Sequence, residues 1–219
     1  MGNRMPDLAF RIEGAEVAQF AATPQIALKL HLTNADPAET IHSVALRCQI
    51  QIEVTRRRYT AEEQEKLRDL FGEPDRWCQT LRNLLWIHVN VNVPTFQGST
   101  GVDLPVPCTF DFNVAATKYF HGLGDGDVPL CLMFSGIVFY GHKVGHMQVS
   151  PISWEKEARF DLPVKTWREM MDTYYPNSVW LSLRRDVFER LYEYKIRHGI
   201  PTWEEALESM LEAEEAVQR

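Results

Sequence analysis

Three histidines lie in two glycine-rich segments where a metal ion could be bound. His142 and His146 are four residues apart, and His121 precedes another cluster of glycines. A four-residue spacing brings two imidazoles to one metal ion when both residues lie on a helix. Gly141 and Gly145 disfavour a helix, so a zinc site built from all three histidines requires the two turns to meet at one edge of a sheet. Exposed histidines in turns are the other interpretation.

The segment from Gly122 to Asp127 combines glycines with carboxylates, as phosphate-binding and calcium-binding loops do. A dinucleotide-binding loop lies between a strand and a helix, whereas residues 129–140, which follow here, have the composition of a strand. A calcium loop supplies about five or six oxygen ligands and a closing glutamate, and this segment offers only Asp125 and Asp127. Glycine and aspartate are also what hairpin turns require, so we predict a hairpin turn.

The sequence shows no motif for cysteine or serine chemistry. Its four cysteines are Cys48, Cys78, Cys108 and Cys131, and no two of them are spaced as Cys-x-x-Cys. All but Cys78 lie in strand-like apolar patterns, where a thiol packs as a small hydrophobic group, so we expect buried thiols. A Gly-x-Ser-x-Gly motif is missing as well. We therefore assign no catalytic residue and expect no cofactor, and an enzyme with a site assembled from distant residues remains an alternative.

Large aromatic side chains are the more suggestive feature, since phenylalanine, tryptophan and tyrosine make up 11% of the chain. Tryptophan and tyrosine are enriched where proteins meet their partners. The candidate partner-binding residues are Trp86, Trp154, Trp167, Tyr174, Trp180 and Trp203. Burial of these rings in the core is the other interpretation. Rings that stay exposed are expected to form an oligomer interface, an apolar groove for an extended polypeptide, or both.

The hydrophobic period changes along the chain and predicts the elements that position these residues. Alternating or continuous apolar patterns predict strands at 26–32, 44–54, 85–93, 108–120, 129–140 and 154–162. In the strand at 85–93, Trp86 is expected on the less apolar face. A loop rich in glycine and proline is expected at 94–107. Helical periods start at Pro163 and again near Val187, and Gly199 and Pro201 end the second helix.

Two capping boxes complete the assignment of elements. Thr60 with Glu63 starts a helical insertion, 60–84, between strands, and Thr202 with Glu205 starts a final amphipathic helix with an acidic face. Strands followed by helices indicate an α+β protein with an antiparallel sheet. We predict a single α+β domain over residues 1–201 and a C-terminal acidic helix over 202–219.

Length, composition and charge exclude several classes of protein. The 219 residues include 45% apolar residues, which is typical of a folded domain. A net charge of −7 disfavours nucleic acid as a partner. The longest apolar stretch, 128–138, is shorter than the roughly 20 residues of a membrane span. The first residues lack the apolar core of a secretory signal, so a cytoplasmic location is expected.

Four segments carry a resemblance to a known family. They are Leu67–Pro74 (LRDLFGEP), Thr100–Phe112 (TGVDLPVPCTFDF), Met133–Tyr140 (MFSGIVFY) and Tyr174–Ser178 (YYPNS). With them, nearly the whole chain resembles an uncharacterised bacterial family, domain-of-unknown-function family 6084. The resemblance implies no catalytic residues. It does imply a genomic context, because members are often encoded beside uptake [NiFe] hydrogenases.

A more remote similarity concerns the SecB-type export chaperones. Residues 114–201 are similar to them in the order of a long strand, a glycine-containing hairpin and a long helix closed by glycine and proline. Tyr175-Pro176-Asn177, Arg184, Arg185, Gly199 and Pro201 carry the likeness. It implies a metal-free antiparallel fold whose aromatic grooves hold unfolded chains as a homo-oligomer. The insertion at 60–84 and the greater length depart from that family.

The leading hypothesis from the sequence is a non-enzymatic, chaperone-like accessory protein that binds an apolar segment of a protein client. The resemblance implies a hydrogenase subunit as that client. The first alternative is a module that binds a small ligand or a metal at a sheet edge containing His121, His142 and His146. The second alternative is an unrecognised enzyme.

Overall fold

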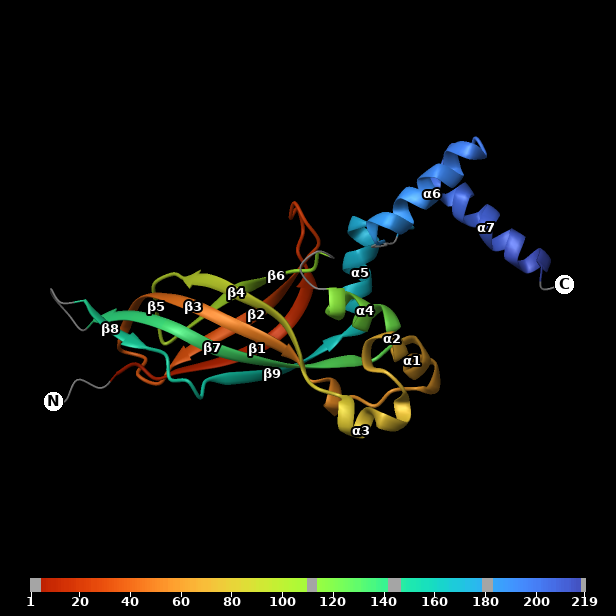
Figure 1. Ribbon diagram of the computed structural model, residues 1–219. Coiled ribbons are helices and arrows are strands. Elements are labelled where there is room, and N and C mark those ends of the chain that lie inside the picture. The colour runs from red at the N-terminus through yellow and green to blue at the C-terminus, as the bar shows by residue number, and fades with distance from the viewer. Residues whose placement is uncertain (1–4, 110–113, 142–146, 179–182, 218–219) are drawn as a thin grey trace. The chain divides into compact units, whose positions relative to one another are not determined.

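The computed structural model of the chain describes residues 5–109, 114–141, 147–178 and 183–217 (Figure 1). It divides into a sheet unit, Met1–Asn177, and a helical unit, Ser178–Arg219. The division therefore falls earlier than the boundary at residue 201 that the sequence suggested. Within the helical unit, the helix that precedes Gly199 packs against the last helix.

Two antiparallel sheets form the sheet unit, as the α+β prediction requires. The smaller sheet has the order β1-β2-β6, with β1 at Leu8–Val17, β2 at Gln25–Asn34 and β6 at Ser99–Pro107. The larger sheet has the order β4-β3-β7-β8, with β3 at Thr40–Ile52, β4 at Leu84–Val93, β7 at Asp127–Gly141 and β8 at Gln148–Pro151. Two shorter strands complete it, because β5 (Phe96–Gln97) pairs with β3 and β9 (Glu157–Pro163) pairs with β7.

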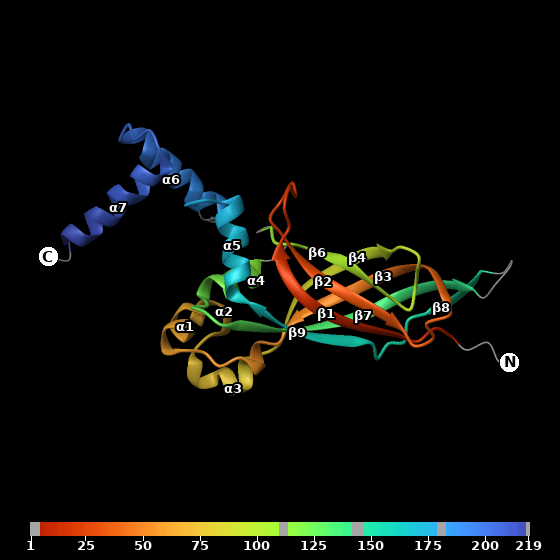
Figure 2. The same cartoon turned by 180° about the vertical axis from the view of Figure 1, so that it is seen from behind.

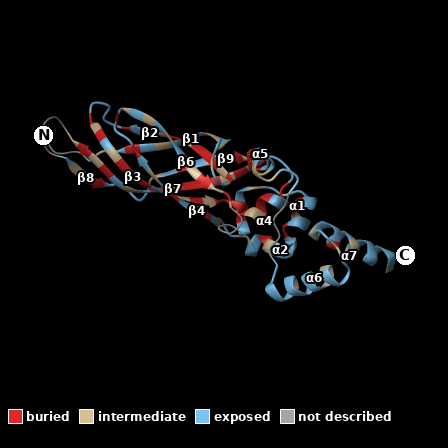
Figure 3. Ribbon diagram, turned by 90° about the horizontal axis from the view of Figure 1, so that it is seen from above, coloured by how far each residue is buried: buried red, intermediate tan, exposed pale blue. Residues whose placement is uncertain are grey.

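The core lies between the two sheets (Figures 1 and 2). Alternate residues of β2 and β3 are buried, as their period of two predicted, and Ile26, Leu28 and Ile50 have no exposed surface. Across the interface, the rings of Phe10 in β1 and Phe134 in β7 stack with centroids 4.3 Å apart. Along the strands in Figure 3, buried residues accordingly alternate with more exposed ones.

The predicted helical insertion is present and lies at one end of the sheets (Figure 1). It contains α1 (Ala61–Lys66), α2 (Arg68–Phe71) and α3 (Trp77–Thr80), with one short 3₁₀ turn at Pro74–Arg76. Thr60 and Glu63 form the expected capping box at the start of α1. Two further helices, α4 (Val114–Gly122) and α5 (Val164–Tyr174), lie at the same end. The rings of Phe120 in α4 and Trp167 in α5 stack with centroids 5.3 Å apart.

Between residues 94 and 122, three elements differ from the sequence-based predictions. Residues 114–122 are helical rather than part of a strand, because Ala116, Tyr119 and Phe120 share one buried helix face. The expected loop at 94–107 contains β5 and β6. β6 tolerates Pro105 and Pro107 because it pairs with β2 alone and is an edge strand of the small sheet.

The helical unit contains α6 (Arg185–Arg197) and α7 (Trp203–Val217). Gly199, with φ of 63°, lies just after α6 in the left-handed conformation that ends many helices. The two helices contact each other through the rings of Phe188 and Trp203, whose centroids are 5.2 Å apart, and through the hydroxyls of Tyr194 and Ser209, 3.2 Å apart.

Candidate functional site

A groove with a volume of about 490 Å³ lies where the chain enters β1 and where β8 gives way to β9. We call it the edge groove. Its lining residues come from the N-terminal segment, from β7 and from residues 150–156. They are Met5, Pro6, Asp7, Leu8, Val138, Ser150, Pro151, Ile152, Ser153, Trp154 and Lys156. Most of these side chains are apolar, so the groove suits an apolar ligand.

A break in the edge strand of the large sheet forms one wall of the groove. β8 pairs with residues 137–140 of β7, and β9 pairs with residues 127–133. Between them the chain bulges outward, held by hydrogen bonds from the Ile152 amide to the Gly136 carbonyl and from the Phe134 amide to the Lys156 carbonyl, at 3.0 and 2.8 Å. Trp154 lies in this bulge and keeps 91% of its side chain exposed.

An ion pair joins the two walls of the groove. The Lys156 ammonium lies 2.6 Å from the Asp7 carboxylate. The Asp7 carbonyl also accepts a hydrogen bond from the Ala35 amide at 2.9 Å, which anchors the segment that precedes β1. The two charged groups of the groove are therefore matched to each other, and the surface left for a ligand is mainly apolar.

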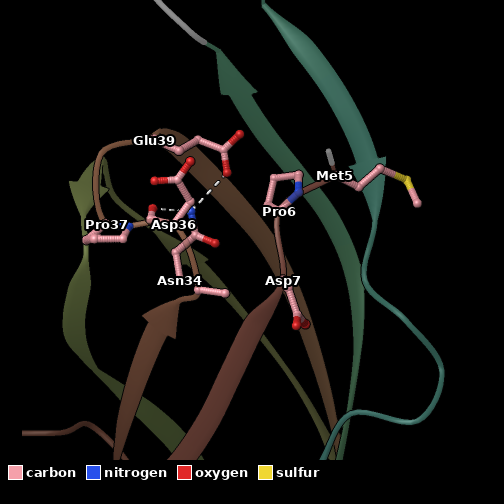
Figure 4. Close-up of a pocket in the computed structure, with 8 residues that line it drawn as sticks. Met5, Pro6, Asp7, Asn34, Asp36, Pro37 and Glu39 are labelled. Carbon is pink, nitrogen blue, oxygen red and sulfur yellow. Dashed lines mark hydrogen bonds between the residues drawn. The ribbon is translucent and has the colours of Figure 1, made fainter. Parts of the chain in front are cut away.

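A smaller pocket of about 260 Å³ adjoins the edge groove and shares Met5, Pro6 and Asp7 with it (Figure 4). Its polar wall contains Asn34 and Glu39, each only 3% exposed. The Asn34 side-chain amide donates to the Glu39 carboxylate at 2.9 Å and to the Asp36 carbonyl at 3.1 Å. These bonds close the turn between β2 and β3, so we assign the wall a structural role.

Of the six aromatic candidates, Trp154 alone lines the edge groove among the residues that the structure describes. Trp86 and Trp167 are buried, at 3% and 5% exposure. Trp86 was expected on the less apolar face of its strand. Ile50 pairs with Ile87 and Gln51 pairs with Leu85, so Trp86 has no partner on β3 and is the extra residue of a β-bulge. Its ring therefore turns into the core and packs against Phe120.

The remaining aromatic candidates fall into different surroundings. The Tyr174 hydroxyl donates to the carbonyls of Ala18 and Ala21, at 3.0 and 3.2 Å, and so holds the turn between β1 and β2. Trp203 belongs to the helical unit, where it packs against Phe188 and Tyr192. Trp180 lies outside the described residues.

The proposed histidine site is described only in part. The ring of His121, at the end of α4, lies edge-on to Trp167 with centroids 5.7 Å apart. His142 and His146 lie outside the described residues. Within the described ranges, no group of three or more His, Cys, Asp or Glu side chains is arranged to hold a metal ion.

The Gly122–Asp127 segment joins α4 to β7, so it is not the hairpin turn between strands that we expected. The Arg57 guanidinium donates to the carbonyls of Asp125 and Asp127, both at 2.5 Å, and Arg168 donates to those of Leu123 and Gly124. The Gly124 amide donates to the Glu63 carboxylate at 2.8 Å. Because these backbone groups already have partners within the chain, we assign the segment a structural role.

The buried thiols are poor nucleophiles. Burial raises the pKa of the Cys48 and Cys108 thiols to about 12, and burial is also the main cause of the raised pKa of Cys131. A thiol with such a pKa carries almost no thiolate at neutral pH. These three cysteines are therefore small core side chains, as the apolar patterns around them predicted.

The sequence analysis missed most of the edge groove. Its walls are brought together by the pairing of β7 with β8 and β9, and the N-terminal segment carries no motif. One signal was present, because Pro151 and the sequence Ser-Trp-Glu interrupt the apolar pattern that precedes residue 157. Such an interruption in an edge strand indicates a bulge.

The model of a family of unknown function, DUF6084, matches residues 5–219, and the chain belongs to that family. A comparison with curated proteins gives no match. Among solved structures, a selenomethionine-labelled β-glucosidase from Kluyveromyces marxianus is similar at 10% identity with a TM-score of 0.27. The match covers 74% of this chain and 15% of the other, and at this score it carries no argument about fold or activity.

None of the helices that the structure describes combines the length and the apolar character needed to cross a membrane.

Proposed function

We propose that the protein is a non-enzymatic accessory protein that holds an apolar segment of a client polypeptide in the edge groove. The observation that carries the proposal is the position of Trp154. This side chain is 91% exposed in the bulge between β8 and β9, at the rim of a groove lined mainly by apolar residues.

Exposure of so large an apolar ring has a cost in water, which a bound partner removes. Burying apolar surface is worth about 25 cal/mol per Å², and tryptophan is among the residues that dominate binding energy at interfaces. The volume of about 490 Å³ lies within the roughly 300–1,000 Å³ of ordinary ligand sites.

The groove is more suitable for an apolar polypeptide segment than for a charged small molecule. Its charged pair, Asp7 and Lys156, is satisfied internally at 2.6 Å, and the hydroxyl of Ser150 donates to the Pro151 carbonyl at 3.3 Å. These three polar side chains are therefore already engaged, whereas Met5, Ile152 and Trp154 offer surface without a directional requirement.

An aggregation assay tests this function. Light scattering of a chemically unfolded client is followed on dilution. A hydrogenase subunit is the first client, because the resemblance noted in the sequence implies that genomic context. The protein should delay aggregation at equimolar concentration, and Trp154→Ala should weaken the delay. A matched control is Leu85→Ala, which removes a side chain that is 53% exposed on β4, away from the groove. Equal delay by all three proteins contradicts the proposed role of the groove.

A further inference from the structure

The two helices of the helical unit expose unusually large apolar side chains. No residue of α6 is buried, and the exposed fractions of Phe188, Tyr192 and Ile196 are 45%, 49% and 62%. In α7, Leu207 and Leu211 are 39% and 61% exposed. Two helices that enclose so little of their own apolar surface are marginal in water, so this surface requires a cover.

These exposed residues and the half-buried Trp203 form one continuous face. Phe188, Tyr192 and Ile196 are spaced i, i+4, i+8 along α6, as are Trp203, Leu207 and Leu211 along α7, so each set follows one side of its helix. The two sets meet where the Trp203 ring lies 5.2 Å from that of Phe188 and 6.1 Å from that of Tyr192. We call these six residues the hairpin face.

Charge identifies what can cover the hairpin face. α7 carries six glutamates and no lysine or arginine: Glu204, Glu205, Glu208, Glu212, Glu214 and Glu215. α6 carries four basic residues against three acidic ones. Two copies of α7 side by side repel each other, whereas α6 of one copy and α7 of another attract.

We propose that the hairpin face is a self-association surface, on which a second copy of this chain packs so that α6 of each protomer lies against α7 of its partner. A two-fold axis makes such an interface reciprocal, since each contact occurs twice. The arrangement buries both hairpin faces, and it places the acidic helix beside the more basic one in both halves. It involves only the helical unit and is independent of the edge groove.

The mass of the full chain in solution gives the first test. Light scattering coupled to size-exclusion chromatography should give twice the 25.3 kDa of one chain, and Ile196→Glu with Leu211→Glu should give a single-chain mass. Both residues are more than half exposed in the isolated chain, so circular dichroism should stay unchanged. The exposed Leu85→Glu in β4 is the matched control and should remain a dimer. A single-chain mass for the unmodified protein at roughly 100 μM overturns the proposal.

A charge-swap experiment tests the reciprocal pairing itself. One variant makes α6 acidic with Arg185→Glu and Arg190→Glu. The other makes α7 basic with Glu208→Lys, Glu212→Lys, Glu214→Lys and Glu215→Lys. Each variant alone brings like charges together and should be monomeric at low salt. Mixed, the two variants restore opposite charges at both halves of the interface and should form a one-to-one dimer.

The outcomes of the mixing experiment are decisive in both directions. A mixed dimer that dissociates as salt rises supports pairing of α6 with α7, because salt screens exposed charges. Two variants that stay dimeric alone, or a mixture that stays monomeric, overturn it. Trp154→Ala should remain dimeric whether or not it binds a client, so this test and that of the edge groove can fail separately.

Discussion

The Arg57 guanidinium and the Glu63 carboxylate form an ion pair of 2.7 Å with only 8% and 5% of their side-chain surfaces exposed. Glu63 also accepts hydrogen bonds from the amides of Thr60 and Gly124, at 2.9 and 2.8 Å. Burial acts to raise the pKa of Glu63, but these hydrogen bonds and Arg57 outweigh it, so the pKa is lowered from its ordinary value of 4.5. The pair fastens α1 to the turn before β7.

Glu63→Gln should therefore destabilise the protein and change its response to acid. Removing one partner of a buried pair costs roughly 3–5 kcal/mol, because the other charge is left buried. In the unmodified protein the folded pKa is depressed, so the stabilisation is complete above pH 4.5 and is lost as the pH falls through the lower folded value. Urea unfolding across this pH range should show a steep fall in the free energy of unfolding for the unmodified protein and a shallower fall for Glu63→Gln.

The control for this prediction is Glu62→Gln on the same helix. Glu62 pairs with Lys66 at 2.6 Å, but its side chain is 78% exposed, and such surface pairs contribute about 0–1 kcal/mol. If Glu62→Gln and Glu63→Gln lower the free energy of unfolding equally, the buried pair of Arg57 and Glu63 has no special role in stability.

Gly136 should be intolerant of any side chain. Its φ is 142°, and a Cβ there lies 2.1 Å from the Ala45 carbonyl oxygen of the neighbouring strand. Gly136→Ala should cost at least about 3 kcal/mol or prevent folding, since β3 and β7 must separate locally. Gly14→Ala is the comparison, because nothing lies within 4 Å of its Cβ position. Thermal melting of both variants checks the difference, and matching midpoints refute it.

Replacing a buried tryptophan should lower the free energy of unfolding far more than replacing the exposed Trp154. Trp86→Ala removes a side chain that is 3% exposed and should cost roughly 3–5 kcal/mol of unfolding free energy. Trp154→Ala removes a side chain that is 91% exposed and should change the free energy of unfolding by no more than about 0.5 kcal/mol. Chemical denaturation measures both, and a large loss at Trp154 argues that this ring is structural.

Thiol reactivity should distinguish Cys78 from the other three cysteines. Cys78 is exposed, whereas Cys48, Cys108 and Cys131 are buried. Burial raises the pKa of Cys48 and Cys108 to about 12, so at about pH 8 a disulfide reagent should modify only Cys78 rapidly in the folded chain. Unfolding in denaturant should make the other three thiols reactive. A Cys78→Ser variant should show no rapidly reacting thiol in the folded state. Rapid reaction of more than one thiol contradicts the described core.

Strand periodicity predicted β2, β3 and β4 well, because each has one face in the core. It failed where an irregularity intervenes. β1 was not predicted, since a register shift between Ile12 and Gly14 disrupts its alternation. The bulge in β4 reversed the expected orientation of Trp86. A bulge moves one residue to the other face, and sequence alternation alone does not locate it.

The candidate site was harder to predict from the sequence than the strands, because it is formed by contacts between separate segments of the chain. Trp154 was identified from its residue type, but the groove beside it requires the pairing of Ile137 with Pro151 and the ion pair of Asp7 with Lys156, whose partners are far apart in sequence. The last helix was more predictable. The spacing of Trp203, Leu207 and Leu211 along one helix gives its apolar face directly.

Binding of an apolar peptide at the edge groove is the most direct test of the central proposal. Fluorescence anisotropy of a dye-labelled, extended apolar peptide is titrated with the unmodified protein, with Trp154→Ala and with Leu85→Ala. The proposal predicts saturable binding, a dissociation constant at least about tenfold higher for Trp154→Ala and no change for Leu85→Ala. No binding by the unmodified protein, or equal affinity of all three, contradicts it.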